Sequence, residues 1–94
     1  MKVAWTRLAI AGLNSAYDYI AEESPSAAHQ TIQRIEKAIR LINRYPEIGR
    51  PGRIKGTREL IISGTPFIVP YRLANHRIEL LAVIHGSQRW PESI

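Results

Sequence analysis

The chain has 94 residues, of which 45% are hydrophobic, and it contains no cysteine. This length allows one domain, residues 1–94, with one small core, and the apolar fraction excludes a wholly disordered chain. The lack of cysteine excludes disulfide scaffolds, thiolate zinc sites and cysteine nucleophiles, and it fits the reducing cytoplasm, where we expect the protein to act. No run approaches the roughly 18 apolar residues of a membrane span, and we recognise no signal peptide, so we expect no membrane association.

The net charge of +5 is concentrated in the middle of the chain. Residues 31–60 contain eight lysines and arginines against three glutamates, a local net charge of +5, whereas residues 1–30 have a net charge of −1 and residues 61–94 a net charge of +1. Clustered positive charge indicates a polyanionic partner, either a nucleic acid or an acidic protein segment. The alternative is that the charge only maintains solubility, since +5 is ordinary for a small domain.

The first third of the chain predicts a short strand followed by a helix. Residues 2–5 form a short apolar-leaning run, and Thr6 can cap the helix after it. The apolar residues that follow recur at spacings of three and four, which is one face of an amphipathic helix. They are Ile10, Leu13, Tyr17 and Ile20. Gly12 lies inside this helix, where a glycine often marks close packing, and we expect the helix to end near Glu23.

Ser24 and Pro25 predict the start of a second helix. Ser24 can serve as N-cap, and Pro25 then occupies the first helical position, where its missing N–H costs nothing. The predicted buried face consists of Ala28, Ile32, Ile35, Ile39 and Ile42. The helix ends at residues 45–46, since a residue before proline avoids the α region. The tight connection between the two helices predicts an antiparallel hairpin.

A loop and three strands complete the prediction. Residues 46–57 contain three glycines and two prolines and are predicted to be irregular. The expected strands are residues 59–62, 67–73 and 77–85, joined by turns at 63–66 and 74–76. Pro70 removes a ladder donor, so we expect an irregularity in the second strand. The third strand is a nearly continuous apolar run and should be central.

The order of these elements predicts an α+β fold of the form β-α-α-β-β-β. Short hairpin connections make the C-terminal sheet antiparallel, and the N-terminal helical hairpin must cover one of its faces.

Few residues suggest catalysis. The histidines are not spaced as metal ligands and no acidic cluster accompanies them, so we expect no metal and no cofactor. No nucleophile motif is present, and the glycines of residues 49–56 do not fit a Walker loop. The remaining candidates are cations and an aromatic ring that could bind a target or a polyanion: Arg50, Arg53, Lys55, Arg58, Arg72, Arg89 and Trp90. An arginine beside an aromatic ring can hold a phosphate while the ring stacks on a base.

Each candidate has a structural alternative. Trp90 could belong to a core or an interface, and His85 could be a satisfied hydrogen-bonding residue. Arg58 could form only a surface pair with the neighbouring Glu59. The basic residues of the second helix are interpreted as a solvated face: Arg34, Lys37, Arg40 and Arg44.

The chain resembles toxins of the RelE/ParE superfamily of type II toxin–antitoxin systems over essentially its whole length. The strongest matching segments are residues 56–60, 68–72, 83–85 and 89–91, and weaker ones are the opening strand and helix, residues 19–28 and residues 45–49. The resemblance implies a helical hairpin on an antiparallel sheet. It also implies a toxin neutralised by a cognate antitoxin, which wraps an extended or helical segment along it in a higher-order complex.

The resemblance leaves two targets. RelE-like members cleave mRNA on the ribosome with basic residues, but the arginine they place on the second C-terminal strand is missing from residues 67–70, and Trp90 cannot replace their terminal tyrosine hydroxyl. The catalytic candidates for such an endoribonuclease are Arg53, Lys55, His85 and Arg89. Residues 71–72 and 83–85 are more similar to ParE toxins, which poison DNA gyrase without being nucleases. We favour the gyrase target; the alternatives are the endoribonuclease and a non-toxic basic module that binds nucleic acid.

Overall fold

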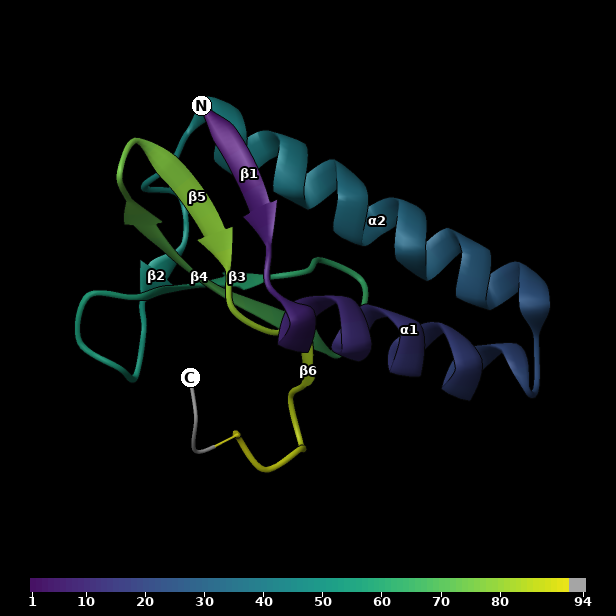
Figure 1. Ribbon diagram of the computed structural model, residues 1–94. Coiled ribbons are helices and arrows are strands. Elements are labelled where there is room, and N and C mark those ends of the chain that lie inside the picture. The colour runs from purple at the N-terminus through teal and green to yellow at the C-terminus, as the bar shows by residue number, and fades with distance from the viewer. Residues whose placement is uncertain (92–94) are drawn as a thin grey trace.

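Two helices cover one face of a six-stranded sheet in the computed structural model, which describes residues 1–91 (Figure 1). The elements are β1 (Lys2–Trp5), α1 (Arg7–Ala21), α2 (Pro25–Arg44), β2 (Arg50–Pro51), β3 (Arg58–Ile61), β4 (Phe67–Ala74), β5 (Arg77–Leu80) and β6 (Ile84–His85). The strand order is β1-β5-β4-β3-β2, and β6 also pairs with β4. The predicted α+β class and element order are confirmed.

The sheet is mixed rather than wholly antiparallel. β1 pairs with β5 in parallel, with Val3 opposite Ile78 and Trp5 opposite Leu80, whereas the pairs among the later strands are antiparallel. The prediction of an antiparallel sheet is therefore wrong at this edge. Short turns impose antiparallel pairing only on the strands they join, and β1 is separated from β5 by both helices and three strands.

The segment after α2 is more regular than predicted. Residues 46–57 were expected to form only a loop, but Arg50 and Pro51 pair with β3 as the short strand β2. A proline is tolerated here because β2 is an edge strand, and no further strand requires a backbone N–H from its outer side. Gly52 continues this pairing by donating its N–H to the carbonyl of Thr57 at 2.8 Å.

Pro70 produces the expected irregularity. Tyr71 of β4 pairs with Leu80 of β5, but Ile68 of β4 pairs with Ile84 of β6, so residues 81–83 contain one residue more than the facing stretch of β4. This extra residue is a β-bulge. Leu81 donates its N–H to the carbonyl of Pro70 at 2.8 Å. The nitrogen of Pro70 lies on the same side of β4, but it has no hydrogen to donate in return. The predicted continuous third strand is therefore divided into β5 and β6.

Both helix caps are confirmed. The Thr6 hydroxyl oxygen accepts the N–H of Ala9 at 3.2 Å and donates to the carbonyl of Leu80 at 2.7 Å, so it also ties the start of α1 to β5. The Ser24 hydroxyl oxygen accepts the N–H of Ala27 at 3.1 Å, and Pro25 follows in the first turn of α2.

The two helices match their predicted buried faces to different degrees. Four of the five residues predicted for α2 are buried, and Ile32 is half-buried. On α1 the buried residues are Ala9 and Ala16, while the predicted Ile10 and Tyr17 are 45% and 38% exposed. The other two predicted residues, Leu13 and Ile20, are half-buried and pack against the core, so the predicted contact face of α1 is correct in part.

Close packing explains the orientation of α1. A Cβ on Gly12 would lie 2.5 Å from the carbonyl oxygen of Val83, so the helix backbone rests directly on the bulged segment. Only small residues allow this approach.

Gly12→Ala should therefore destabilise the fold by about 1–3 kcal/mol, although alanine favours the helix, because the added methyl group meets backbone atoms that cannot rotate away. Urea unfolding measures the change. Asn14→Ala, at an exposed position of the same helix, is the matched control and should be neutral or slightly stabilising. Equal effects of the two substitutions would contradict the close contact.

Candidate functional site

The carboxylate of Glu59 organises the cationic loop between α2 and β3. Glu59 is 4% exposed, and its Oε1 accepts hydrogen bonds from Nε and Nη2 of Arg50 at 3.1 and 2.9 Å. Its Oε2 accepts the backbone N–H of Arg53 at 2.9 Å. A buried carboxylate is stable only when its charge and lone pairs are matched in this way. Glu59 therefore attaches both β2 and the start of the following loop to β3.

Tyr71 fixes the chain just before β2. Its fully buried hydroxyl donates to the carbonyl of Pro46 at 2.8 Å and accepts the N–H of Gly49 at 2.9 Å. Burial raises the pKa of this hydroxyl, an effect partly offset by the Gly49 hydrogen bond and by the charge of Arg58. Gly49 has no room for a side chain, since a Cβ would lie 2.7 Å from the Tyr71 ring.

Arg58 binds backbone rather than its neighbour in sequence. Its Nη1 donates to the carbonyls of Glu47 and Gly49 at 3.2 and 2.8 Å. The suggested surface pair of Arg58 with Glu59 is therefore wrong, because successive residues of a strand point to opposite faces. Strand alternation alone could have shown this.

Arg53 connects the cationic loop to the C-terminal tail, residues 86–91. Its guanidinium lies 4.1 Å from the centre of the Trp90 ring, a cation–π contact. Arg53 and Trp90, which the sequence suggested as a phosphate-binding cation and a base-stacking ring, thus do lie together, but they stack on each other. Arg50, Arg53 and Trp90 form one connected group around Glu59.

The remaining cationic candidates lie elsewhere. Lys55 and Arg72 line a separate hollow of about 310 Å³. Arg72 pairs with Glu79 at 2.6 Å, and Arg77 pairs with the other oxygen of the same carboxylate at 3.0 Å. These two arginines, Arg72 above all, lower the pKa of Glu79. Arg89 is exposed on the tail.

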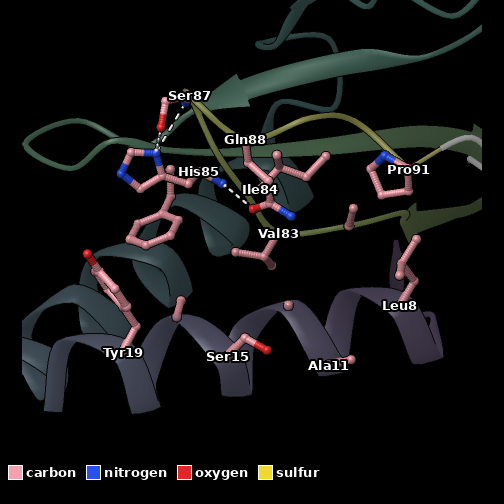
Figure 2. Close-up of a pocket in the computed structure, with 14 residues that line it drawn as sticks. Leu8, Ala11, Ser15, Tyr19, Val83, Ile84, His85, Ser87, Gln88 and Pro91 are labelled. Atoms are coloured by element: carbon pink, nitrogen blue, oxygen red, sulfur yellow. Dashed lines mark hydrogen bonds between the residues drawn. The ribbon is translucent and has the colours of Figure 1, made fainter. Parts of the chain in front are cut away.

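A groove of about 570 Å³, which we call the α1 groove, separates α1 from the segment that follows the bulge (Figure 2). Its walls include Leu8, Ala11, Ser15 and Tyr19 of α1 and Val83, His85, Gln88 and Pro91 on the opposite side. Figure 2 shows Tyr19 rising from α1 toward the His85 end of the groove. The tail forms part of one wall, so the shape of the groove depends on where the tail is attached.

His85 is oriented by its own neighbours. Its Nδ1 accepts the backbone N–H of Ser87 at 3.2 Å and lies 2.8 Å from the Ser87 hydroxyl, so in the neutral ring Nε2 carries the proton. The ring packs edge-on against Phe67, with 5.5 Å between the centroids. Among residues 1–91, the lining of the groove includes no carboxylate that could partner this imidazole.

The four catalytic candidates do not line one common groove. His85 lines the α1 groove, Lys55 lines the hollow beside Arg72, Arg53 stacks on Trp90, and Arg89 is exposed on the tail. Within residues 1–91, no group of three histidine or acidic side chains is arranged to hold a metal ion. No helix in the same range is long and apolar enough to cross a bilayer.

Comparison with known proteins assigns the family. Residues 3–90 match the family model described as the ParE toxin of the type II toxin–antitoxin system parDE. The chain belongs to the ParE toxin family. It is 41% identical over 91 residues to Y4kP of Sinorhizobium fredii, which is named as a candidate toxin; the match covers 97% of this chain and 94% of that protein.

Two further similarities support the assignment as a toxin. The chain is 31% identical over 87 residues to the toxin RelE2 of Caulobacter vibrioides, covering 93% of this chain and 97% of the relative. It also matches a solved structure described as the chromosomal ParDE toxin–antitoxin system from P. aeruginosa, with a TM-score of 0.81 and 30% identity over 90% of this chain and 95% of that one. This protein is therefore a ParE-family toxin of a type II toxin–antitoxin system.

Sequence reasoning missed several residues that shape this ParE toxin. Glu59 and Tyr71 are buried polar groups in strands, but each lies next to an arginine in the sequence, so the sequence pattern gave no sign of their burial. Tyr19 was assigned to the first helix only as part of a matching segment, yet it is 74% exposed at the mouth of the α1 groove. Tyr19 lies off the apolar face predicted from the helical spacing, so that spacing alone could have identified it as a large exposed aromatic residue.

Tyr71→Phe should destabilise the ParE fold by about 1–3 kcal/mol, because the carbonyl of Pro46 and the N–H of Gly49 lose their partner. The wild type should also lose stability as the pH rises above 10.0, since the unfolded chain ionises its tyrosine before the folded state does. Urea unfolding at neutral and alkaline pH measures both effects. Tyr17→Phe, on the partly exposed face of α1, is the control, and an identical pH dependence in Tyr71→Phe and wild type would contradict this role.

Arg53→Ala should release the tail, because Trp90 loses its cation–π partner, a contact worth about 0.5–2 kcal/mol. Acrylamide quenching of tryptophan fluorescence measures this release in a Trp5→Phe background, where Trp90 is the remaining tryptophan. Quenching should increase in Arg53→Ala and stay unchanged in Lys55→Ala. Equal quenching of both variants would show that the stacking does not attach the tail.

Proposed function

We propose that this toxin inhibits growth by acting on DNA gyrase without cleaving nucleic acid, and that a cognate antitoxin neutralises it. The observation that carries this proposal is that His85 lines the α1 groove while Arg53, Lys55 and Arg89 are not among the described residues that line it. Membership of the ParE family favours the same target.

A ribonuclease needs its proton donor or acceptor and its cations on one phosphodiester. General acid–base groups act within hydrogen-bond reach of the reacting atoms, and the stabilising charges must point at the same phosphate. Here His85 of β6 lines the α1 groove, Lys55 lines a different hollow, and the face of the Arg53 guanidinium stacks on Trp90. A toxin that acts by binding a protein target has no such requirement.

The mRNA endoribonuclease is the second candidate, and one observation favours it. His85 and Tyr19 line the same groove, so a titratable ring and a phenolic hydroxyl face one accessible space. The relative named RelE2 is consistent with this alternative.

Induction of the chain in growing cells, with pulse labelling of DNA and protein synthesis, separates the two candidates. The gyrase proposal expects DNA synthesis to fall first, with DNA breaks and spared translation, and it expects co-expression of the antitoxin to restore growth. In vitro, the purified toxin should inhibit supercoiling by gyrase and leave ribosome-bound mRNA intact.

His85→Ala is the informative variant. If translation falls first and mRNA cleavage disappears in His85→Ala while the variant remains folded, the gyrase proposal is wrong and the endoribonuclease stands. If neither synthesis falls and growth continues, the protein is not a growth-inhibiting toxin under these conditions, and both candidates fail.

A further inference from the structure

The face of the sheet opposite the helices is covered only in part. The helices pack on the face that carries Tyr71 and Ile78, which belong to the hydrophobic core. Successive side chains of a strand point to opposite faces, so Pro70 and Arg72 of β4 lie on the second face. At the Pro70 end this second face is covered, because Pro70 and its partner Glu59 are both buried. Arg72 is exposed, so the cover ends along β4.

The uncovered part spans β1, β5 and the C-terminal half of β4, which are neighbours in the sheet (Figure 1). We call it the basic face and define it by the side chains that alternation and register place there. They are Lys2, Ala4, Arg72, Ala74, Arg77 and Glu79. Three cations and one carboxylate give this face a net charge of +2.

One carboxylate holds two of the three cations. Oε1 of Glu79 accepts a hydrogen bond from Nε of Arg72 at 2.6 Å, and Oε2 accepts one from Nη2 of Arg77 at 3.0 Å. The two arginine side chains remain 53% and 45% exposed. Each guanidinium carries five N–H donors, so donors remain for a ligand that approaches from solvent. Glu79 therefore positions the two arginines without using up their hydrogen-bonding capacity.

The third cation faces a like charge. Lys2 lies directly opposite Arg77 in the parallel pair of β1 and β5. Like charges on directly opposed residues of neighbouring strands destabilise a sheet. Within residues 1–91, no carboxylate forms an ion pair with Lys2, and Glu79 faces Ala4 on β1. An anion bound between Lys2 and Arg77 would remove this repulsion.

The hollow of about 310 Å³ extends the positive charge beyond β4. Arg72 belongs to the basic face and also lines the hollow, and Lys55 lines it from the cationic loop. Thr6 and Thr57 line it as well, and its described lining includes no carboxylate. Arginine and lysine form strong charge-assisted hydrogen bonds with phosphate oxygens. The cations thus form a continuous series from the edge strand β1 to the cationic loop.

The composition of the basic face favours a phosphate backbone over a protein segment. Apart from its charged groups it presents only Ala4 and Ala74, so a peptide finds no large apolar side chain at the centre of the contact. Phosphates need only cations, and each contact releases condensed counterions. None of the side chains that define the face is aromatic, whereas proteins that bind single strands stack the bases on aromatic rings. A duplex, which binds through its backbone, fits this surface best.

We infer that the basic face and the adjoining hollow bind the phosphate backbone of double-stranded DNA without reading its sequence. This inference rests on the proposed function for the choice of DNA over double-stranded RNA, because the proposed target acts on DNA. The toxin then holds the DNA substrate of gyrase while it acts on the enzyme.

The test is a titration of a short fluorescent DNA duplex of mixed sequence with the purified full-length toxin, followed by anisotropy at several salt concentrations. Each phosphate contact contributes about −0.9 to the slope of log Kobs against log salt concentration. Arg77→Gln should therefore weaken binding and make the slope shallower by about one such contact, and Lys55→Gln should do the same through the hollow.

Arg40→Gln is the matched control. It makes the same chemical change at an exposed position of α2, which packs on the opposite face of the sheet, and it should leave the slope unchanged. Urea unfolding confirms that the variants are folded. Equal slopes for Arg77→Gln and Arg40→Gln, or no binding of the wild type at low salt, would overturn the basic face as a DNA contact. An unchanged slope in Lys55→Gln would exclude the hollow from it.

Competition with other nucleic acids tests the choice of ligand. Unlabelled duplex DNA should displace the probe more effectively than duplex RNA or single-stranded DNA of the same sequence. Stronger displacement by either of the other two would overturn double-stranded DNA as the ligand.

Supercoiling assays with gyrase separate this inference from the proposed function. Weaker inhibition by Arg77→Gln than by Arg40→Gln supports both. If the wild type inhibits gyrase but binds no duplex, the proposed function stands and this inference fails. If the wild type binds the duplex through the basic face but leaves gyrase active, the proposed function fails and the DNA contact stands.

Discussion

The buried carboxylate of Glu59 is the contact on which much of this structure depends. It joins β2 to β3 through Arg50 and positions the loop through the N–H of Arg53. The Arg53 side chain then stacks on Trp90, and the tail that carries Trp90 forms one wall of the α1 groove. One desolvated charge, stable only because it is fully paired, thus connects the edge of the sheet to the groove beside α1.

Tyr71 and Glu59 together also determine where the sheet remains open. Tyr71 fixes the turn before β2, and Glu59 pairs with the first residue of that strand, so β2 begins at Arg50 and leaves Ile61 uncovered. The molecule consequently presents two separate grooves, one beside each helix.

Several predictions from the sequence were accurate because they depend on local chemistry. Thr6 and Ser24 cap helices through their own hydroxyl groups, and α2 has one uninterrupted aliphatic stripe that no alternative face could match. Predictions that required knowledge of a distant partner were wrong. The buried face of α1 was placed on Ile10, Leu13, Tyr17 and Ile20, of which Leu13 and Ile20 pack against the core. Ile10 and Tyr17 were misplaced, because Gly12 and the two alanines allow a closer approach to Val83. The direction of β1 was likewise set by β5, which lies more than seventy residues away.

The candidate site divides in the same way. The sequence by itself determined the α+β order, the cationic middle of the chain, the family resemblance and the irregularity at Pro70, since each follows from residue type and spacing. Only the tertiary structure decided which partner each cation has: it paired Arg50 with Glu59 and Arg72 with Glu79, and it stacked Arg53 on Trp90. It also placed His85 in the α1 groove, whose described lining includes none of these arginines. Charge is a property of the residue, whereas the partner that neutralises it comes from another strand and is fixed by register and burial.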